Sequence, residues 1–314
     1  MSNLSIVFMG TPDFAKSILK HLVEKKYKVV GVVTAADKPA GRKLKLQESA
    51  VKKYAQTQNI SVLQPKNLKN EAFLKELKEL KADVQIVVAF RMLPKEVWQM
   101  PKFGTFNLHA SLLPDYRGAA PIHWAIINGE TKTGVTTFFI DDKIDTGEII
   151  LKKEATIDED DIVGALHDKL MILGRNLVVE TLDFIEKGIV KTTRQTDLEE
   201  KAAPKLSPEN TKIDWNEPLE KVYNKIRGLN PFPASWTNIQ TNGEEISAKI
   251  YAVKKEECDH SFSIGKIISN KKELKVAVKN GFINVLEIKL AGKKLMDIKS
   301  LLNGFSFSED SKML

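Results

Sequence analysis

The stretch LSIVFMGTPDFAKSILKHLVEKKYKVVGVVT, residues 4–34, decides the fold of this 314-residue chain. It opens with LSIVFMG, a short apolar run ending in glycine, which is typical of a buried strand. The next segment, PDFAKSILKHLVEKKY, has apolar residues at helical spacing and a proline suited to a first helical turn. KVVGVVT then predicts a second strand. A strand, a helix and a strand in succession predict two parallel strands joined by a right-handed crossover.

The same alternation continues downstream. An amphipathic helix is predicted at 70–81, a buried strand at 83–90 and a further strand at 104–110. Alternation of this kind predicts an α/β domain of the Rossmann type, with a doubly wound, mostly parallel sheet.

Beyond residue 120 the pattern changes. Strands predicted at 133–140 and 148–157 flank a turn, which favours a hairpin added to the sheet. One long helix is expected over 160–188, with a soft point at Gly174. The following segment, 189–215, has little apolar periodicity and is typical of a linker. Several short strand-like runs after it predict a small β-barrel or sandwich.

Length and composition are those of an ordinary globular protein. A chain of 314 residues predicts two domains, and its 42% hydrophobic content suits a full core. The sequence has no apolar run of about eighteen residues, so we expect no membrane partner. It begins without the basic segment of a secretory signal, and Cys258 is its single cysteine. We therefore expect a cytoplasmic protein.

The formal net charge of +7 favours a polyanionic partner without identifying one. Many of the lysines are best read as solvated faces of helices. On charge alone, nucleic-acid binding is one interpretation among several.

Several common kinds of site are excluded by pattern. MGTPDFA has one glycine, so the dinucleotide fingerprint fails, and there is no Walker A motif. No G-x-S-x-G elbow presents a serine nucleophile, and Cys258 lies in a polar stretch unsuited to a catalytic thiol. No metal is expected, because the histidines lack ligand spacing. They are His21, His109, His123, His167 and His260.

Asn107 and His109 are the residues that could carry chemistry. They lie two apart in a predicted strand, so their side chains point the same way. An amide and an imidazole together could stabilise a developing oxyanion and move a proton, which acyl transfer to an amine requires. Such a site also needs a carboxylate, and Asp145 is the best candidate, with Asp141 and Asp142 as rivals that suit turn formation. The alternative is a strand end whose polar side chains bond nearby backbone.

The constellation resembles the formyltransferases that use 10-formyltetrahydrofolate. NLHASLLPDYRGAAPI at 107–122, followed by IDTGEI at 144–149, carries the likeness. Further segments narrow it to the methionyl-tRNA formyltransferase family: FMGTPDFA, ADKPAGR, KLSPENTKIDW, IRGLNPFPASW and AGKKL. They occur in order from near Ile6 to near Leu302, almost the whole chain.

The resemblance implies a Rossmann-type domain at 1–189 that binds folate and catalyses formyl transfer. It further implies a linker at 190–208 and an oligonucleotide-binding-like β-barrel at 209–314 that binds tRNA. The implied reaction moves a formyl group from 10-formyltetrahydrofolate to the α-amine of methionine on initiator Met-tRNA, through a tetrahedral intermediate. A monomer without metal is expected.

Residue by residue, the resemblance implies that Asn107, His109 and Asp145 are catalytic, with Asn107 and His109 holding the tetrahedral oxygen and Asp145 assisting proton transfer. The implied folate segment is Ser111, Leu112, Leu113 and Pro114. The residues implied to contact tRNA are Arg42, Lys43, Lys45 and Lys205.

The sequence departs from the family pattern in two loops. After VVAF the family often has YGLILP, whereas this chain has FRMLP at 90–94, one residue shorter, in a loop that helps to shape the folate pocket. We expect Arg91 to alter contacts with the cofactor. The basic loop also lacks a second glycine after Arg42.

Three rival functions are weighed. Glycinamide ribonucleotide formyltransferases share the catalytic residues but lack the long C-terminal extension. A formyltransferase acting on an amino sugar is a second rival. The third, from a different class, is a non-catalytic RNA-binding protein on an enzyme scaffold.

Overall fold

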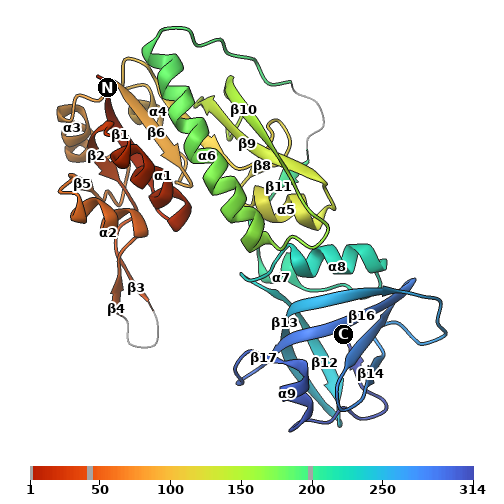
Figure 1. The fold of residues 1–314 in the computed structure, drawn as a ribbon. Coiled ribbons are helices and arrows are strands. Elements are labelled where there is room, and N and C mark those ends of the chain that lie inside the picture. Colours follow the sequence, from red (N-terminus) through yellow and green to blue (C-terminus); the bar gives the residue numbers. More distant parts are fainter. Residues whose placement is uncertain (1–2, 41–44, 197–200) are drawn as a thin grey trace. The chain divides into compact units, whose positions relative to one another are not determined.

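A computed structural model of the chain describes residues 3–40, 45–196 and 201–314. The chain divides into two compact units, each described here by itself (Figure 1). Unit 1 comprises Met1–Gly118, Thr133–Ala155 and His167–Ala202, and unit 2 comprises Ala119–Lys132, Thr156–Leu166 and Ala203–Leu314. The chain therefore passes from one unit to the other more than once.

Unit 1 is built on a seven-stranded sheet with the strand order β10-β9-β7-β6-β1-β2-β5. Neighbouring strands from β5 to β7 are parallel, and β9 pairs antiparallel with β7. The predicted mostly parallel sheet is confirmed. Its strands are β1 (Ser5–Gly10), β2 (Lys28–Val33), β5 (Val62–Leu63), β6 (Val84–Val88), β7 (Thr105–His109), β9 (Lys132–Phe139) and β10 (Ile149–Thr156).

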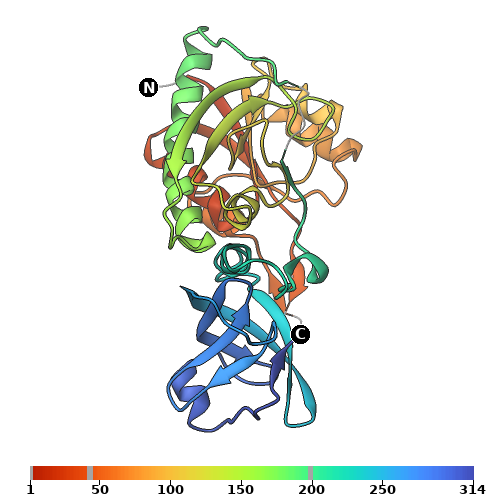
Figure 2. The same cartoon turned by 90° about the vertical axis from the view of Figure 1, so that its right-hand side faces the viewer.

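Helices cover both faces of this sheet (Figures 1 and 2). On one face, Phe73 and Leu77 of α3 and Val97 of α4 join a buried cluster with strand residues of alternating positions, such as Val7 and Val87. The helices are α1 (Asp13–Glu24), α2 (Ala50–Thr57), α3 (Glu71–Glu79), α4 (Lys95–Trp98) and α6 (Val163–Glu186).

The opposite face is packed by α6. This helix continues through Gly174, where we expected a soft point. A Cβ atom at Gly174 would lie 2.8 Å from Leu108 Cδ2 on β7. The glycine therefore serves close packing of the helix against the sheet.

Two short two-stranded sheets accompany the main sheet. Part of the predicted basic loop forms a hairpin, β3 (Lys38–Ala40) with β4 (Lys45–Gln47). A second two-stranded sheet joins β8 (Arg117–Gly118) to β11 (Ala202–Ala203). Both were missed because runs of two or three residues leave no periodic signal.

Unit 2 contains the other large β-sheet, in the order β14-β15-β16-β13-β12-β18, with β17 paired to β16. An antiparallel bridge between Lys266 and Lys312 connects its two ends, so the strands form a nearly closed barrel. The predicted barrel is confirmed. Its strands are β12 (Ser235–Thr241), β13 (Glu244–Glu257), β14 (Ile267–Ser269), β15 (Leu274–Val278), β16 (Gly281–Leu290), β17 (Met296–Asp297) and β18 (Lys312–Met313).

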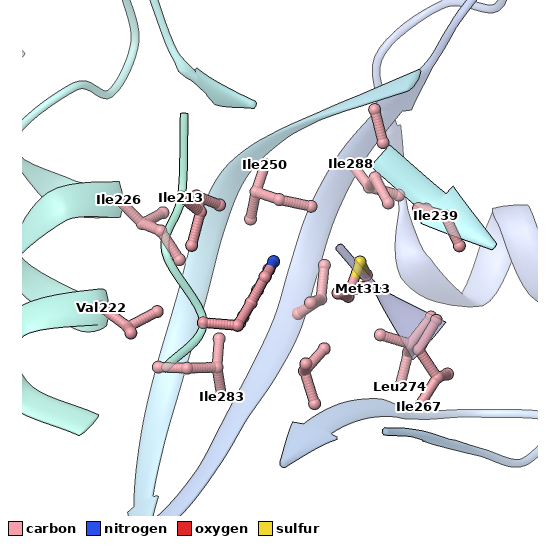
Figure 3. Close-up of a cluster of buried hydrophobic side chains, with 14 of the residues drawn as sticks. Ile213, Val222, Ile226, Ile239, Ile250, Ile267, Leu274, Ile283, Ile288 and Met313 are labelled. Carbon is pink, nitrogen blue, oxygen red and sulfur yellow. The ribbon is translucent and has the colours of Figure 1, made fainter. Parts of the chain in front are cut away.

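The barrel core is mostly aliphatic and is capped by a helix. Val222 and Ile226 of α8 face barrel residues such as Ile250 and Ile283 in one buried cluster (Figure 3). The helices of this unit are α5 (Pro121–Ile127), α7 (Pro208–Thr211), α8 (Leu219–Arg227) and α9 (Ile298–Leu302). Within the described ranges, every helix is too short or too polar to span a bilayer.

A polar contact fixes α8 to the segment Thr156–Leu166 of the same unit. The Tyr223 hydroxyl donates a 2.8 Å hydrogen bond to Asp160 Oδ1, and Arg227 Nη1 donates to the Asp161 carbonyl at 2.8 Å. Burial, and then the bond to the Asp160 carboxylate, raise the pKa of Tyr223 to about 12.

Candidate active site

Asn107 is the middle residue of the five-residue strand β7, and His109 is its last. Asn107 pairs with Val87 of β6 on one side and with Phe138 of β9 on the other. Since Val87 belongs to the cluster beneath α3 and α4, both polar side chains face that side of the sheet. They therefore stand at the carboxyl end of a parallel strand, where ligands of open α/β sheets bind.

The ring of His109 is held by backbone. It is 6% exposed, and its Nε2–H donates to the carbonyl oxygen of Tyr116 at 2.8 Å. A carbonyl can only accept, so the proton on Nε2 is fixed there. Nδ1 is therefore the ring nitrogen left for proton transfer, and it lies 3.7 Å from Asp145 Oδ2.

Asp145 lies in the loop between β9 and β10 with a φ of +55°, in the left-handed region. Its carboxylate accepts a 2.9 Å hydrogen bond from the amide of Gly118. The side chain is 15% exposed. Asp145 thus brings a constrained carboxylate near His109 from a different part of the chain.

The competing carboxylate Asp141 has another role. It accepts hydrogen bonds from the Thr146 hydroxyl at 2.8 Å and the Lys143 amide at 3.0 Å. These contacts close the loop in which Asp145 lies, which is the turn-forming role expected for Asp141.

Asn107 carries a polar atom without a partner. Its amide oxygen Oδ1 is buried and accepts no hydrogen bond from the residues that the structure describes. Buried polar atoms are almost always bonded, so an unbonded one beside His109 fits a position where a ligand supplies the partner.

The predicted folate segment follows β7 and is anchored from within. The Ser111 hydroxyl donates to the carbonyl of Asp115 at 2.6 Å, and Leu113 is fully buried in a cluster with Phe138. Lys152 Nζ donates to the Leu113 carbonyl. Ser111 and Leu113 therefore hold the segment in place, and the half-buried Leu112 and Pro114 are its more accessible members.

The shortened FRMLP loop borders a hollow of about 570 Å³. Arg91 donates from its guanidinium to the carbonyls of Lys66 and Pro65, at 2.9 Å for Lys66. Its side chain is thus occupied in fixing this loop to the segment before α3. The hollow is lined by Lys66, Asn67, Leu68, Lys69, Arg91, Met92, Leu93, Pro94, Lys95 and Glu96.

The residues predicted to contact tRNA are described only in part. Arg42 and Lys43 lie outside the described residues, and Lys45 is described by its backbone in β4. Lys205, in unit 2, is exposed, and its carbonyl accepts a 3.0 Å hydrogen bond from Asn210. Among the described residues there is no cluster of side chains suited to a metal ion.

Gln195 is a site residue that the sequence did not indicate. It lies in the segment interpreted as a linker, yet it is only 7% exposed. Its Nε2 donates to the carbonyls of Asp145 at 3.0 Å and Gly147 at 2.7 Å. Its Oε1 accepts from Arg117, at 3.1 Å from Nε and 2.6 Å from Nη2. A single polar residue in a non-periodic segment gives no signal for such contacts.

Comparison with known proteins places these features in a family. Residues 4–182 match the model of the family described as Formyl transferase, and residues 205–306 match that of the Formyl transferase C-terminal domain. A methionyl-tRNA formyltransferase of Flavobacterium johnsoniae is 59% identical over 314 residues, covering 100% of both chains. One from Bacteroides thetaiotaomicron is 53% identical, covering 99% of this chain and 98% of its own.

Solved structures share the fold at lower identity. The N-formyltransferase from Helicobacter canadensis, in complex with folinic acid and dTDP-3-aminofucose, is 20% identical with a TM-score of 0.67, covering 90% of this chain and 98% of its own. WlaRD, a sugar 3N-formyltransferase, is 19% identical with a TM-score of 0.65, covering 93% and 99%. At these identities the likeness concerns the fold alone.

Proposed function

The chain belongs to the methionyl-tRNA formyltransferase family, and from this premise we propose that it formylates the α-amino group of methionine on initiator Met-tRNA. The formyl donor is 10-formyltetrahydrofolate. The observation that carries the proposal is the 59% identity to a methionyl-tRNA formyltransferase along the full length of both chains. N-formylmethionyl-tRNA for translation initiation is the product.

The catalytic centre of the proposal is Asn107, His109 and Asp145. The folate supplies the formyl carbon as an amide that an amine can attack. The amide N–H of Asn107, and His109 once its Nδ1 carries the proton from the amine, stabilise the charge that develops on the formyl oxygen as the new C–N bond forms. The unbonded amide oxygen of Asn107 supports a ligand at this position.

His109 and Asp145 carry the proton in this proposal. Nε2 of His109 is committed to the Tyr116 carbonyl, so Nδ1 takes part in moving the proton released by the amine. Asp145 stabilises the charged ring and keeps it oriented. The bond from the formyl carbon to N10 breaks as N10 takes the proton that His109 accepted from the amine. The step needs no covalent enzyme intermediate.

Binding of the two substrates is assigned to separate segments. We assign the folate to the segment of Ser111, Leu112, Leu113 and Pro114. Since Ser111 and Leu113 are engaged internally, Leu112 and Pro114 are the members that contact it. For tRNA, Arg42, Lys43, Lys45 and Lys205 supply cations that bind phosphates, consistent with a net charge of +7.

One experiment separates this function from its rivals. Purified protein is given 10-formyltetrahydrofolate with one acceptor at a time: Met-tRNA, glycinamide ribonucleotide, or an amino-sugar nucleotide. We expect turnover with Met-tRNA to exceed that with either small acceptor by orders of magnitude. Preference for a small acceptor would overturn the proposed acceptor, and turnover with none would favour a binding protein. Sedimentation of the same sample tests the expected monomer, and fractionation of cells tests the expected cytoplasmic location.

A further inference from the structure

We propose that Gln195 is a positioning residue that sets the Asp145 carboxylate relative to His109. The inference rests on the proposed function, because it concerns the centre assigned there. All its contacts lie within unit 1.

Gln195 holds the Asp145 loop by its backbone. Its amide nitrogen donates to the carbonyls of Asp145 and Gly147, two positions of one short turn, at 3.0 and 2.7 Å. Because Asp145 has a φ of +55°, its backbone is in the left-handed region, which is uncommon for residues other than glycine. The two bonds from Gln195 support this conformation from outside the loop.

The other end of the Gln195 amide fixes the segment that binds the Asp145 side chain. Its oxygen accepts two hydrogen bonds from the guanidinium of Arg117. The next residue, Gly118, donates from its amide to Asp145 Oδ2 at 2.9 Å. The Gln195 side-chain amide therefore connects the backbone of Asp145 to β8, whose Gly118 amide orients the Asp145 carboxylate.

The polarity of these partners leaves the amide one orientation. Two carbonyls require a donor on one side, and a guanidinium requires an acceptor on the other. A glutamate at this position would keep the acceptor for Arg117 but would place an oxygen against the carbonyls of Asp145 and Gly147. A methionine would keep the size and remove both functions. The pair of variants separates the two ends of the bridge.

We expect Gln195→Met and Gln195→Glu to lower kcat by about 10- to 100-fold, since misplacing a catalytic group by about 1 Å has effects of this size. KM for Met-tRNA and for the folate should change by less than about threefold, because neither substrate contacts Gln195 in this proposal. Wild-type kcat in Gln195→Met would overturn the inference. Loss in Gln195→Met with full kcat in Gln195→Glu would also overturn it, by assigning the effect to Arg117 alone.

A double-mutant cycle distinguishes positioning from general stabilisation. If Gln195 acts through Asp145, Gln195→Met should reduce kcat by less than about twofold in an Asp145→Asn background. An equal loss in both backgrounds would overturn the inference. Gln85→Met is the matched control, because Gln85 is a second buried glutamine, in β6 and bonded to Thr105, and should leave kcat near wild type.

The cycle also separates this inference from the proposed function. A wild-type protein that does not formylate Met-tRNA disproves the proposed acceptor, and the same variants are then compared with whichever amine acceptor the wild type does formylate. The Gln195 inference is then tested by whether Asp145→Asn reduces the effect of Gln195→Met on kcat with that acceptor.

Discussion

His109 Nδ1 and Asp145 Oδ2 lie 3.7 Å apart, on side chains that are 7% and 15% exposed. His109 is the last residue of β7, whereas Asp145 lies in the loop between β9 and β10. The Gly118 amide holds the carboxylate at this distance. A carboxylate so placed fixes the orientation of the imidazole through its Nδ1 side.

We predict from this pair that Asp145→Asn lowers kcat by roughly 10²- to 10⁴-fold, the range for losing general acid–base assistance. Asparagine keeps the size and the acceptor for Gly118 but removes the charge. Single-turnover formylation at saturating substrates measures the effect. Asp141→Asn in the same loop is the control and should keep kcat within about threefold. Near-normal turnover in Asp145→Asn would remove this residue from the mechanism.

Asn107→Ala should separate activity from stability. Loss of an oxyanion donor lowers kcat by about 10²- to 10³-fold. The free energy of unfolding should not fall by more than about 1 kcal/mol, because the variant also removes a buried oxygen that has no partner among the described residues. Initial rates and urea unfolding measure the two quantities. A large loss of stability with unchanged kcat would assign Asn107 to the fold instead.

Gly147→Ala should disturb the Asp145 loop. A Cβ atom at this buried position would lie 1.7 Å from the carbonyl oxygen of Phe139, so the loop has to move. We expect unfolding to be easier by about 1–3 kcal/mol and kcat to fall. Gly304→Ala is the control, because its Cβ would meet nothing within 4 Å. Equal behaviour of the two variants in urea unfolding and formylation would contradict this account of the loop.

The stabilising contribution of the Tyr223 hydroxyl should be lost as the pH rises above about 10. Its pKa is about 12 in the folded protein and about 10 when unfolded, so between these values the unfolded state releases the proton first and is favoured. The contribution of Tyr223 is complete below pH 10 and is lost toward pH 12. Urea unfolding at about pH 9 and about pH 11 measures it. The stability difference between wild type and Tyr223→Phe should shrink with pH, and a constant difference would refute the assignment.

Binding of tRNA should depend steeply on salt. Each phosphate contact adds about 0.7–0.9 to the slope of log K against log salt concentration. Replacing Arg42, Lys43 and Lys45 together by alanine should therefore reduce the slope by about 2–3 if all three bind phosphate. Filter binding of Met-tRNA at several salt concentrations tests this, with Lys20→Ala, on the exposed side of α1, as the control. An unchanged slope would place the phosphate contacts elsewhere.

The fold was largely predictable because its elements are long and periodic. The strand of 4–10, the helix after Pro12 and the hairpin that became β9 and β10 all follow from hydrophobic spacing. The barrel was predictable as a class, while its near closure through Lys266 and Lys312 was not, because a two-residue bridge has no pattern of its own.

Some residues of the candidate site could also be predicted from the sequence, and others could not. Asn107 and His109 could be paired from a spacing of two in a strand, and Asp145 was the favoured carboxylate of its loop. Gln195 could not be predicted, because its importance comes from contacts 48 and 50 positions away in the chain. The segment around it has no periodicity, which was interpreted as a linker although one side chain in it is anchored in unit 1.

The backbone around the site also bears on attempts to make the enzyme resistant to heat. Ala89 after β6, Tyr116 after β7 and Asp145 all have positive φ, at 46°, 63° and 55°. Such positions disfavour L-residues by about 1–2 kcal/mol, so glycine there would relieve strain. At Asp145 the same change removes the carboxylate. A library selected for survival at high temperature alone would therefore enrich inactive protein, and thermostable variants have to be selected for formylation in the same round.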